Sequence, residues 1–452
     1  MRPPRGSTNR IGTRRRRLYG GRRNRGIRSR LRIARSVSPS LIAPQTKSAI
    51  IAAALRKATT ERMIPNVRST NSVVPAEAEL PTIAVVGAGD VGSAVLRLLA
   101  CSGEVGELWA LDVDGHRAAV AAHDAAAIAL YGRLAPSVSS RAVDVLEPDA
   151  LIAALDEIRP DAIVQAATLQ SWWVVAQLPP PLWRRLENEA RFGPWLPFHL
   201  VPAQRVTAAA AEACPGVPVV NVAFPDAVNP VLAATGPAPT CGAGNSDLLR
   251  PGIRLAAAAA LGVAPSEVEL EFVGHHYHVV YFWMDLEQVE PLDPQSFHLR
   301  IRVGGDDVTD RLGAGAMLAT AGRLLPRGRL IAERTAASAA KNARLLLRAD
   351  ATDDHAAAPC GLAGGYDVRF GQGTATVRLP AGLDADAARR IVERAQLGDG
   401  IAAIGPGGAV TFTERAAVAM RDILGYDCPV LRPDEAPARV EELRARLASA
   451  GR

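Results

Sequence analysis

Short apolar runs alternate with longer alanine- and leucine-rich stretches between residues 81 and 235. The short runs are rich in β-branched residues, whereas the longer stretches space their apolar residues as amphipathic helices do. Strands that alternate with helices in this way form a parallel, doubly wound sheet. We therefore predict an α/β domain over residues 81–235. Its predicted strands are 83–86, 108–112, 140–145, 162–166 and 217–222, and its predicted helices are 92–100, 118–130, 149–158 and 202–213.

The pattern after this region is mixed, with strand-like runs that follow one another as well as helical stretches. It predicts a mixed α+β catalytic or substrate domain over residues 236–430 and a charged amphipathic helix within residues 431–452. The predicted strands are 267–273, 279–283, 297–303, 368–370, 374–379 and 409–411. The predicted helices are 253–261, 310–325, 333–347, 385–395, 414–424 and 437–448.

Residues 1–80 carry 19 Lys and Arg against three Glu and show no periodic apolar face. We predict that they form a disordered Arg-rich extension. The alternatives are a nucleic-acid or targeting arm and a chain start at Met63. The extension has a net charge of +16 and the whole chain one of +6, so the remaining residues sum to −10. This acidic balance gives no reason to expect nucleic acid as a partner of the folded part.

The cysteines are scattered, odd in number and form no CxxC pair, which argues against a disulfide framework or a structural zinc site. They are Cys101, Cys214, Cys241, Cys360 and Cys428. The chain has no run of 18 apolar residues, so we expect no membrane span. These features predict a cytoplasmic protein.

A Gly-x-Gly-x-x-Gly motif follows the first predicted strand and opens a predicted helix, as in Rossmann dinucleotide-binding domains. Its glycines allow a tight turn and a close approach of the backbone to a pyrophosphate, which the helix N-terminus favours. Asp112 ends the second strand twenty residues after Gly92, where an acid accepts hydrogen bonds from a ribose 2′-hydroxyl. The spacing therefore predicts an NAD site and favours NAD over NADP. The loop residues predicted to bind it are Gly87, Gly89, Asp90, Val91 and Gly92.

Ala166 and Ala167 lie at the end of the fourth predicted strand. Small residues at the carboxyl edge of a parallel sheet let a cofactor lie across it, so we predict that both contact NAD. A plain small-residue turn is the alternative interpretation. The next segment, 170–200, holds four of the six tryptophans and is predicted to be a long loop. It fits a lid or pocket wall, or equally a packed surface or subunit contact.

Four polar residues then follow in a recognisable order: Asn221, Asp247, Arg250 and His276. Asn221 lies near the end of the fifth predicted strand. Asp247 and Arg250 follow a glycine-rich turn, and His276 follows Gly274 at the end of another strand. From residue 82 to 285 this order resembles the lactate/malate dehydrogenase superfamily, more loosely to about 430. The resemblance implies an NAD-dependent dehydrogenase that acts on a small-molecule substrate, as a homodimer or tetramer.

The resemblance also implies a role for each residue. His276 would be the acid/base at the carbinol oxygen, because imidazole exchanges protons near neutral pH. Asp247 would hold its other ring nitrogen, and Arg250 would clamp a substrate carboxylate through two parallel hydrogen bonds. Asn221 would position the substrate oxygen or the nicotinamide ribose. Arg254 is an alternative to Arg250, and Arg184, Arg185 and Arg191 are candidates for a mobile-loop arginine.

Other interpretations of the same residues stay open. His275, His276 and His278 lie close enough in sequence to suggest a metal site, although we predict none. Gly274–His276 and the stretch from Asn221 to Pro230 are also similar to segments of glycoside hydrolase family four, which uses NAD with a divalent metal. A non-catalytic dinucleotide-binding regulatory protein would need only the glycine loop and Asp112.

Overall fold

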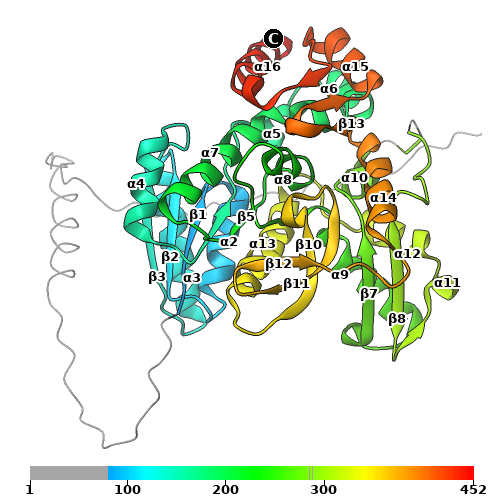
Figure 1. Cartoon of the computed structure of the whole chain (residues 1–452), viewed down its shortest axis with the longest axis horizontal. Coiled ribbons are helices and arrows are strands. Elements are labelled where there is room, and N and C mark those ends of the chain that lie inside the picture. The colour runs from blue at the N-terminus through cyan, green and yellow to red at the C-terminus, as the bar shows by residue number, and fades with distance from the viewer. Residues whose placement is uncertain (1–79, 285, 288, 452) are drawn as a thin grey trace, which may run out of the picture. The chain divides into compact units, whose positions relative to one another are not determined.

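The structure is a computed structural model that describes residues 80–284, 286, 287 and 289–451 (Figure 1). The chain divides into two units, Met1–Pro75 and Ala76–Arg452. The predicted Arg-rich extension lies outside the described residues, apart from residue 80, so everything that follows concerns the second unit. Within the described ranges, no helix is both long and apolar enough to cross a membrane.

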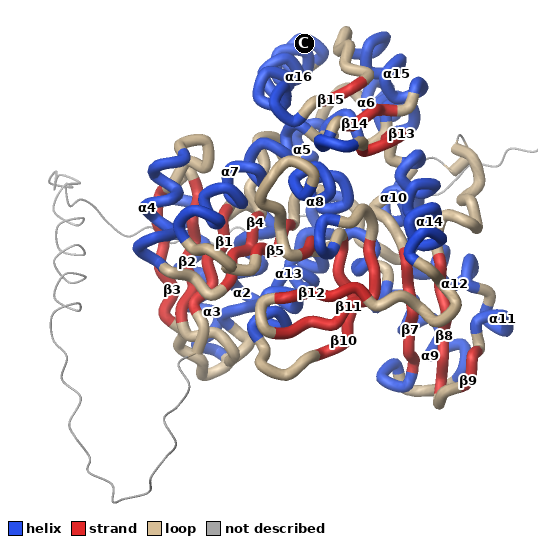
Figure 2. Tube along the Cα trace, viewed as in Figure 1, coloured by secondary structure: helices blue, strands red, loops and turns tan. Residues whose placement is uncertain are grey.

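A nine-stranded sheet forms the centre of this unit (Figure 2). Its order is β12-β11-β10-β6-β5-β4-β1-β2-β3, and the strands from β6 to β3 run parallel. This part has the 3-2-1-4-5-6 order of a Rossmann sheet, which confirms the predicted fold class. The parallel strands are β1 (Thr82–Val86), β2 (Glu107–Asp112), β3 (Ser137–Ala142), β4 (Ala162–Gln165), β5 (Val219–Asn221) and β6 (Cys241–Gly242). The antiparallel strands are β10 (Thr352–Ala357), β11 (Gly365–Gly371) and β12 (Thr374–Val377).

Helices cover both faces of the parallel strands, because successive side chains of a strand point to opposite faces. Ile83 and Val85 of β1 pack in one core with three helices, whereas Ala84 and Val86 pack in another core with two. The helices of the first face are α2 (Asp90–Ala100), α3 (Gly115–Tyr131) and α13 (Ala332–Leu347). Those of the second are α4 (Pro148–Ile158) and α7 (Pro197–Ala213).

The remaining elements form two smaller units of mixed structure. One sheet contains β7 (Val268–Val273), β8 (His298–Val303) and β9 (Asp306–Asp307), with α9 (Arg250–Leu261), α11 (Thr309–Leu312) and α12 (Ala314–Arg323). The other contains β13 (Ile401–Ile404), β14 (Val410–Phe412) and β15 (Val430–Leu431), with α15 (Glu414–Leu424) and α16 (Ala436–Ala450). Helix α14 (Ala385–Gly398) precedes β13 and packs its buried side chains against Val273 of β7 and Tyr366 of β11. The small antiparallel sheets agree with the predicted α+β character of the second half. The domain boundaries themselves stay predictions.

Several elements differ from the sequence prediction. The stretch 279–283, predicted as a strand, is helical and belongs to α10 (Tyr277–Val280) and a 3-10 turn, Tyr281–Trp283. Four of these five residues are buried, and a short run buried on all sides has no period that separates strand from helix. The prediction also missed β10, where polar residues come first, and α8 (Pro225–Ala233), which contains Pro230.

The segment 170–200 is not one long loop. It forms α5 (Trp172–Val175), α6 (Pro180–Arg185), a π-helical turn (Leu186–Ala190) and a 3-10 turn (Gly193–Trp195), and then enters α7. Tryptophan and proline obscured these short helices, because neither residue type favours a helix interior.

The glycine loop depends on the missing side chain at Gly87. This residue has φ +96°, and a Cβ atom there would lie 2.5 Å from the Ala167 nitrogen. A Cβ on Gly92 would lie 1.7 Å from the Gly87 oxygen, so α2 starts directly against the loop. At Gly89, by contrast, a Cβ would meet nothing within 4 Å. Two of the three glycines are therefore required by the fold, and Gly89 faces open space.

We expect Gly87→Ala to lower the free energy of unfolding by about 2 kcal/mol or more, because it adds a positive-φ strain to a backbone overlap. Gly89→Ala is the matched control and should change stability by less than about 1 kcal/mol. Urea unfolding followed by circular dichroism measures both. Equal effects of the two substitutions would contradict this account of the loop.

Candidate functional site

A cavity of about 470 Å³ lies at the carboxyl ends of the parallel strands. Open α/β sheets bind ligands at this edge, where the strand order reverses. The loops after five consecutive strands of the sheet line it. They contribute Gly87, Gly89, Asp90 and Val91 after β1, Asp112 and Val113 at the end of β2, Val143–Val145 after β3, Ala166–Leu169 after β4, and Val222–Phe224 after β5.

The opposite wall comes from later parts of the chain. The tryptophan-rich segment and the start of α7 supply one part of this wall, and the region around His276 supplies the other. The first part consists of Ser171, Trp172, Trp173, Phe192, His199 and Pro202. The second consists of Asn245, Leu248, His276, Val279, Val280, Trp283, Ile331 and Thr335. One cavity thus joins the glycine loop to His276.

The glycine-loop end fits a dinucleotide. Gly89 faces open space in the cavity, and the unpaired N–H groups of the first turn of α2 begin there. Asp90 would repel a pyrophosphate, but its carboxylate forms an ion pair with Arg329. The predicted residues Gly87, Gly89, Asp90, Val91, Asp112, Ala166 and Ala167 all line the cavity, whereas Gly92 is buried behind the loop.

Asp112 links the loop to the second strand. Its Oδ2 accepts a hydrogen bond from the Ala88 nitrogen at 2.7 Å, and its Oδ1 accepts one from the Asp114 nitrogen at 2.9 Å. The Arg117 guanidinium lies 3.6 Å from Oδ1. A carboxylate can accept about four hydrogen bonds, so Asp112 retains capacity for the two hydroxyls of a ribose.

His276 lies at the far end of the cavity, and Asp399 holds its ring. The His276 Nδ1 is 2.9 Å from the Asp399 Oδ2, and the backbone N–H of His276 donates to the Asp226 Oδ2 at 2.7 Å. The Nε2 has no hydrogen bond to any described residue. The predicted pairing of His276 with Asp247 is therefore wrong: Asp399, which directly follows α14, takes this place.

Asp399 is fully buried and interacts with two imidazoles, because the His275 Nδ1 also lies 3.3 Å from its Oδ2. Burial alone would raise the pKa of Asp399, but the charge of His276 and the hydrogen bonds from both histidines hold it below its usual range. Burial likewise would lower the pKa of His275, yet Asp399 and Asp226 raise it above its ordinary value. The cluster therefore favours a negative Asp399 beside a positive imidazole.

The three neighbouring histidines do not converge on one point. The His278 Nδ1 accepts from the His275 nitrogen at 3.0 Å, and its Nε2 lies 3.1 Å from the Ser296 Oγ. Burial lowers the pKa of His278 to about 3, so it is a neutral structural residue. No group of three or more His, Cys, Asp or Glu within the described part of the chain could hold a metal ion.

Asp247 belongs to a separate buried network. The Ser338 Oγ and the Lys341 Nζ of α13 donate to its Oδ2 at 2.6 and 2.9 Å. Lys341 also donates to Asp354 and to the His355 carbonyl, which ties α13 to β10. Asp247 does not line the cavity, so its role here is to join the second half of the chain to the sheet.

Arg250 is also committed elsewhere. Its guanidinium donates to the Asp367 carboxylate on β11, outside the cavity. Burial raises the pKa of Asp367 to about 6, although the charge of Arg250 lowers it. The predicted carboxylate clamp is therefore wrong for Arg250. The alternative clamp residue Arg254 does not line the cavity, and neither do the mobile-loop candidates Arg184, Arg185 and Arg191.

Asn221 uses its side chain within the chain. Its Nδ2 donates to the Ala223 carbonyl and to the Asn229 Oδ1 at 3.1 and 2.9 Å, and its Oδ1 accepts from the Ala223 nitrogen at 2.9 Å. It is fully buried and does not line the cavity. The structure therefore does not bring the Asn221 side chain to the predicted place beside a substrate oxygen or the nicotinamide ribose. Asn221 instead shapes the turn that carries Val222, Ala223 and Phe224 into the wall.

At the His276 end of the site, the sequence analysis had not singled out Asp399, His199 and Asn245. Asp399 lies in a Gly-Asp-Gly turn, which by its sequence is typical of a structural turn. His199 lies in an apolar stretch of α7, and Asn245 lies in a glycine-rich turn. An isolated acid between two glycines is the one signal that could have pointed to Asp399.

The buried His275 should make stability depend on pH. Its pKa is higher in the folded protein than the value of about 6.5 for an unfolded chain. The folded state thus holds the proton more tightly. This stabilisation is complete below pH 6.5 and is lost as the pH rises through the folded-state pKa.

We expect the wild-type free energy of unfolding to fall with pH above 6.5, with a contribution of at most about 1.4 kcal/mol per pH unit that His275→Gln lacks. His123→Gln, at an exposed position on α3, is the matched control and should keep the wild-type slope. Urea unfolding at several pH values measures all three proteins. An unchanged slope in His275→Gln would contradict a proton shared within the cluster.

No model of a known protein family matches the chain, and no curated protein matches it. Solved structures do share its fold. The malate dehydrogenase of Cryptosporidium parvum superposes with a TM-score of 0.50 at 16% identity, covering 71% of this chain and 98% of that one. The lactate dehydrogenase of the same organism, in complex with lactic acid and NAD, gives 0.50 at 15% identity, with 72% and 98% covered.

The apo malate dehydrogenase of Picrophilus torridus gives a TM-score of 0.51 at 18% identity, covering 71% of this chain and 96% of that one. Each of these three structures therefore aligns with this chain over nearly its whole length. The shared architecture, together with the strand order of the sheet, shows that this chain has the lactate/malate dehydrogenase fold.

Proposed function

We propose that this protein is an NAD-dependent oxidoreductase that interconverts a hydroxyl and a carbonyl group, with His276 as the acid/base. One observation carries the proposal: a single cavity connects the glycine loop and Asp112 to His276, whose ring is held by the buried Asp399. A lactate dehydrogenase of the same fold was solved with NAD and lactic acid, which supports this choice of cofactor.

The chain's own residues would bind, orient and exchange a proton. The first turn of α2 would hold the pyrophosphate, and Asp112 would accept hydrogen bonds from the ribose. Bound NAD would supply a carbon centre that takes up a hydride. The side chains of Phe192, Phe224 and Trp172, which line the cavity beside His276, would keep water away from this step.

Asp399 determines which nitrogen of His276 reacts. With the Nδ1–H donating to Asp399, the Nε2 is free to accept the hydroxyl proton while the carbon-bound hydrogen leaves with its electron pair. The resulting imidazolium is stabilised by the negative Asp399, whose pKa the two histidines hold low. In the reverse direction, the same Nε2–H would protonate the carbonyl oxygen. Asp399 is thus a positioning residue.

The alternative functions have less support. The described residues hold no metal-binding group of three, so a metal-dependent glycosidase of family four has no observation in its favour. A non-catalytic NAD-binding protein would need only the glycine-loop end, and it gives no reason for a paired histidine and buried aspartate at the other end. Measuring turnover by variants at His276 separates the proposed oxidoreductase from a non-catalytic NAD-binding protein.

For cofactor choice, we expect Asp112→Asn to reduce the ratio of NAD to NADP affinity by about tenfold, because a charge-assisted hydrogen bond contributes about 1.5–3 kcal/mol. Asparagine keeps an oxygen that can accept from the Ala88 nitrogen. Asp114→Asn, at an exposed helix cap outside the cavity, is the matched control. Calorimetric titration with each dinucleotide measures the ratio, and wild-type preference for NADP would refute the assignment of Asp112.

For catalysis, we expect His276→Gln to bind NADH as the wild type does but to lose roughly 10²- to 10⁴-fold in kcat, the usual contribution of a general acid/base. Asp399→Asn should lower kcat as well, because it removes the negative charge that fixes the ring. His123→Gln serves as the control. NADH fluorescence gives binding, and its absorbance during turnover of a panel of ketones gives kcat. Wild-type kcat in His276→Gln would exclude His276 as the acid/base.

A further inference from the structure

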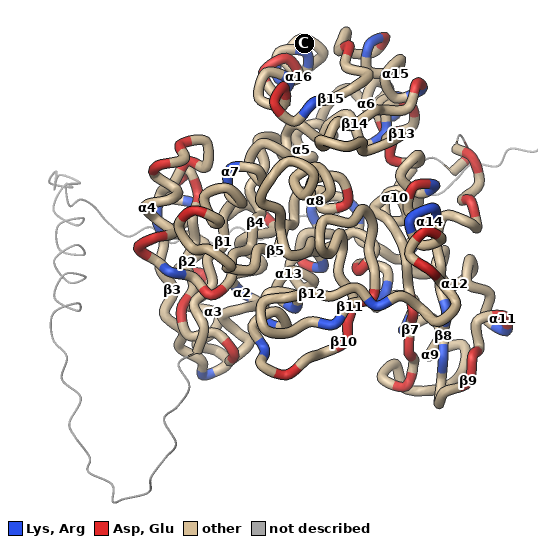
Figure 3. The backbone as a smooth tube through the Cα atoms, viewed as in Figure 1, with Lys and Arg blue, Asp and Glu red and all other residues tan. Residues whose placement is uncertain are grey.

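Charge is distributed unevenly along the cavity. Its charged lining residues are Asp90, Asp112, Arg117 and Asp144, all within or beside the loops that follow β1, β2 and β3. The lining residues from Ala166 onward include no Lys, Arg, Asp or Glu. Many Lys, Arg, Asp and Glu residues instead lie on the outer helices α4, α14, α15 and α16 (Figure 3). Of the residues that the structure describes, none that lines the end for the reacting carbon is therefore charged apart from the imidazoles, and Asp399 lies behind His276 outside the lining.

Aromatic rings surround His276. The ring centroids of Phe192 and Phe224 lie 4.6 and 5.0 Å from that of His276, and those of the two phenylalanines lie 4.6 Å apart. Trp172 continues this aromatic wall, with its centroid 4.6 Å from that of Phe192. Such a wall favours a flat apolar group, because offset and edge-on ring contacts add to the burial of apolar surface.

The polar groups that remain at this end are neutral. Burial, together with the charge of His276, lowers the pKa of His199 to about 3, so its imidazole is uncharged at neutral pH. His199 and Asn245 line the cavity. The His199 Nδ1 and the Asn245 Nδ2 are buried and have no hydrogen-bond partner. Neutral groups of this kind recognise a carbonyl, a hydroxyl or an amide.

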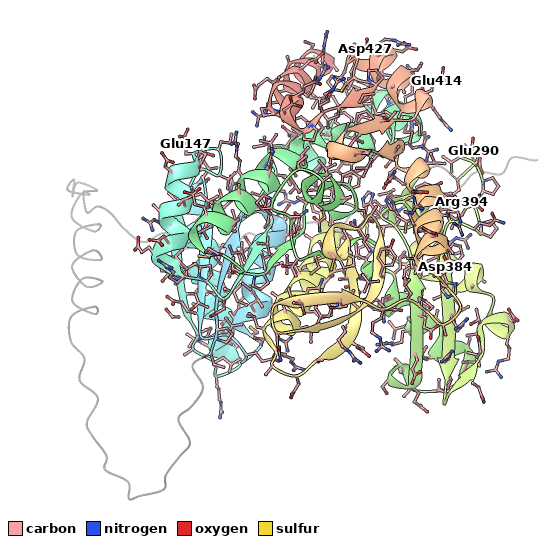
Figure 4. All side chains as sticks on the ribbon, in the orientation of Figure 1. Glu147, Glu290, Asp384, Arg394, Glu414 and Asp427 are labelled. Carbon is pink, nitrogen blue, oxygen red and sulfur yellow. The ribbon has the colours of Figure 1, made fainter. Side chains whose placement is uncertain are left out.

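The arginines near this end are used elsewhere. Arg250 pairs with Asp367, and the buried Arg191 donates to the Met284 Sδ and interacts with Asp399 and Tyr277. The charged side chains labelled in Figure 4, Glu147, Glu290, Asp384, Arg394, Glu414 and Asp427, are exposed to solvent. Among the residues that the structure describes, no Lys or Arg therefore lines the cavity beside His276 to pair with a substrate carboxylate.

From these observations we propose that the substrate is an uncharged alcohol or ketone that carries an aromatic or similarly flat apolar group, with no carboxylate beside the reacting carbon. This inference rests on the proposed oxidoreductase function and specifies its substrate class. The aromatic wall takes the apolar group, His276 faces the reacting oxygen, and His199 and Asn245 provide neutral hydrogen-bonding groups. It departs from the carboxylate-bearing substrate that the sequence predicted.

A binding measurement tests the class without requiring turnover. The NADH-loaded full-length protein is titrated by calorimetry with phenylacetamide and with phenylacetate, which share the ring but differ in charge. We expect phenylacetamide to bind at least about tenfold more tightly, because a carboxylate buried without a partner is strongly disfavoured. Acetamide, which lacks the ring, should bind at least about tenfold more weakly than phenylacetamide. Tighter or equal binding of phenylacetate overturns the proposal, as does the absence of binding by either ring compound.

Turnover then tests the function separately. Phenylacetone and phenylpyruvate differ only in a methyl group against a carboxylate, and we expect kcat/KM to favour phenylacetone by at least about tenfold. Preference for phenylpyruvate overturns the substrate class. If phenylacetamide binds as expected but neither ketone is reduced, the oxidoreductase function fails for this class while the preference of the cavity for uncharged aromatic ligands stands.

Variants assign the binding to this wall. Phe192→Ala should weaken phenylacetamide binding by about fivefold or more, because an aromatic contact and buried area are lost. Tyr131→Ala, at a side chain that is 92% exposed, is the control and should leave binding unchanged. Phe192→Leu keeps the apolar volume and serves if Phe192→Ala fails to fold. Wild-type affinity in the folded Phe192 variants would place the ligand elsewhere and overturn the assignment.

Discussion

The hydrogen bonds of the buried Asp399 hold the far end of the cavity together. This carboxylate lies at the end of α14, more than 120 positions after the two histidines that it contacts. A buried carboxylate without partners would be costly, so the turn after α14 and the stretch His275–His276 stabilise each other. The backbone N–H of His276 donates to Asp226 of α8, which adds a third segment to the same point. The position of His276 in the cavity is thus a product of several distant parts of the chain.

The two ends of the cavity are built on different physical principles. At the glycine-loop end, the backbone itself forms the site: a turn that only glycine tolerates, a helix N-terminus, and an aspartate that accepts from the loop. At the His276 end, side chains from separate segments form the site through ring contacts and one charged pair. The first end carries charged side chains and suits a dinucleotide. The second end is aromatic, and its charged groups are the imidazoles and the Asp399 that holds them.

The order of polar residues that resembles the lactate/malate dehydrogenase superfamily did not predict which of these residues contact one another. Asp247 and Arg250 occupy the expected places in the sequence, yet they join α13 and β11 to the rest of the fold through Lys341 and Asp367. A buried acid or arginine needs a partner wherever it lies, and spacing along the chain does not say which partner it finds. His276 and the glycine loop do line one cavity, because each follows a strand that the local pattern predicts.

The sequence by itself determined the parallel α/β core, the glycine loop and the aspartate at the end of β2, because these depend on local periodicity and on contacts between neighbouring strands. It also placed His276 after β7. Only the tertiary structure decided that Asp399 is the partner of this histidine and that β10–β12 extend the central sheet. It also decided that no arginine of the described residues lines the aromatic wall. These features arise from packing between segments that are far apart in the chain. Burial and the need to satisfy hydrogen bonds select the partners there, and the local sequence pattern does not predict them.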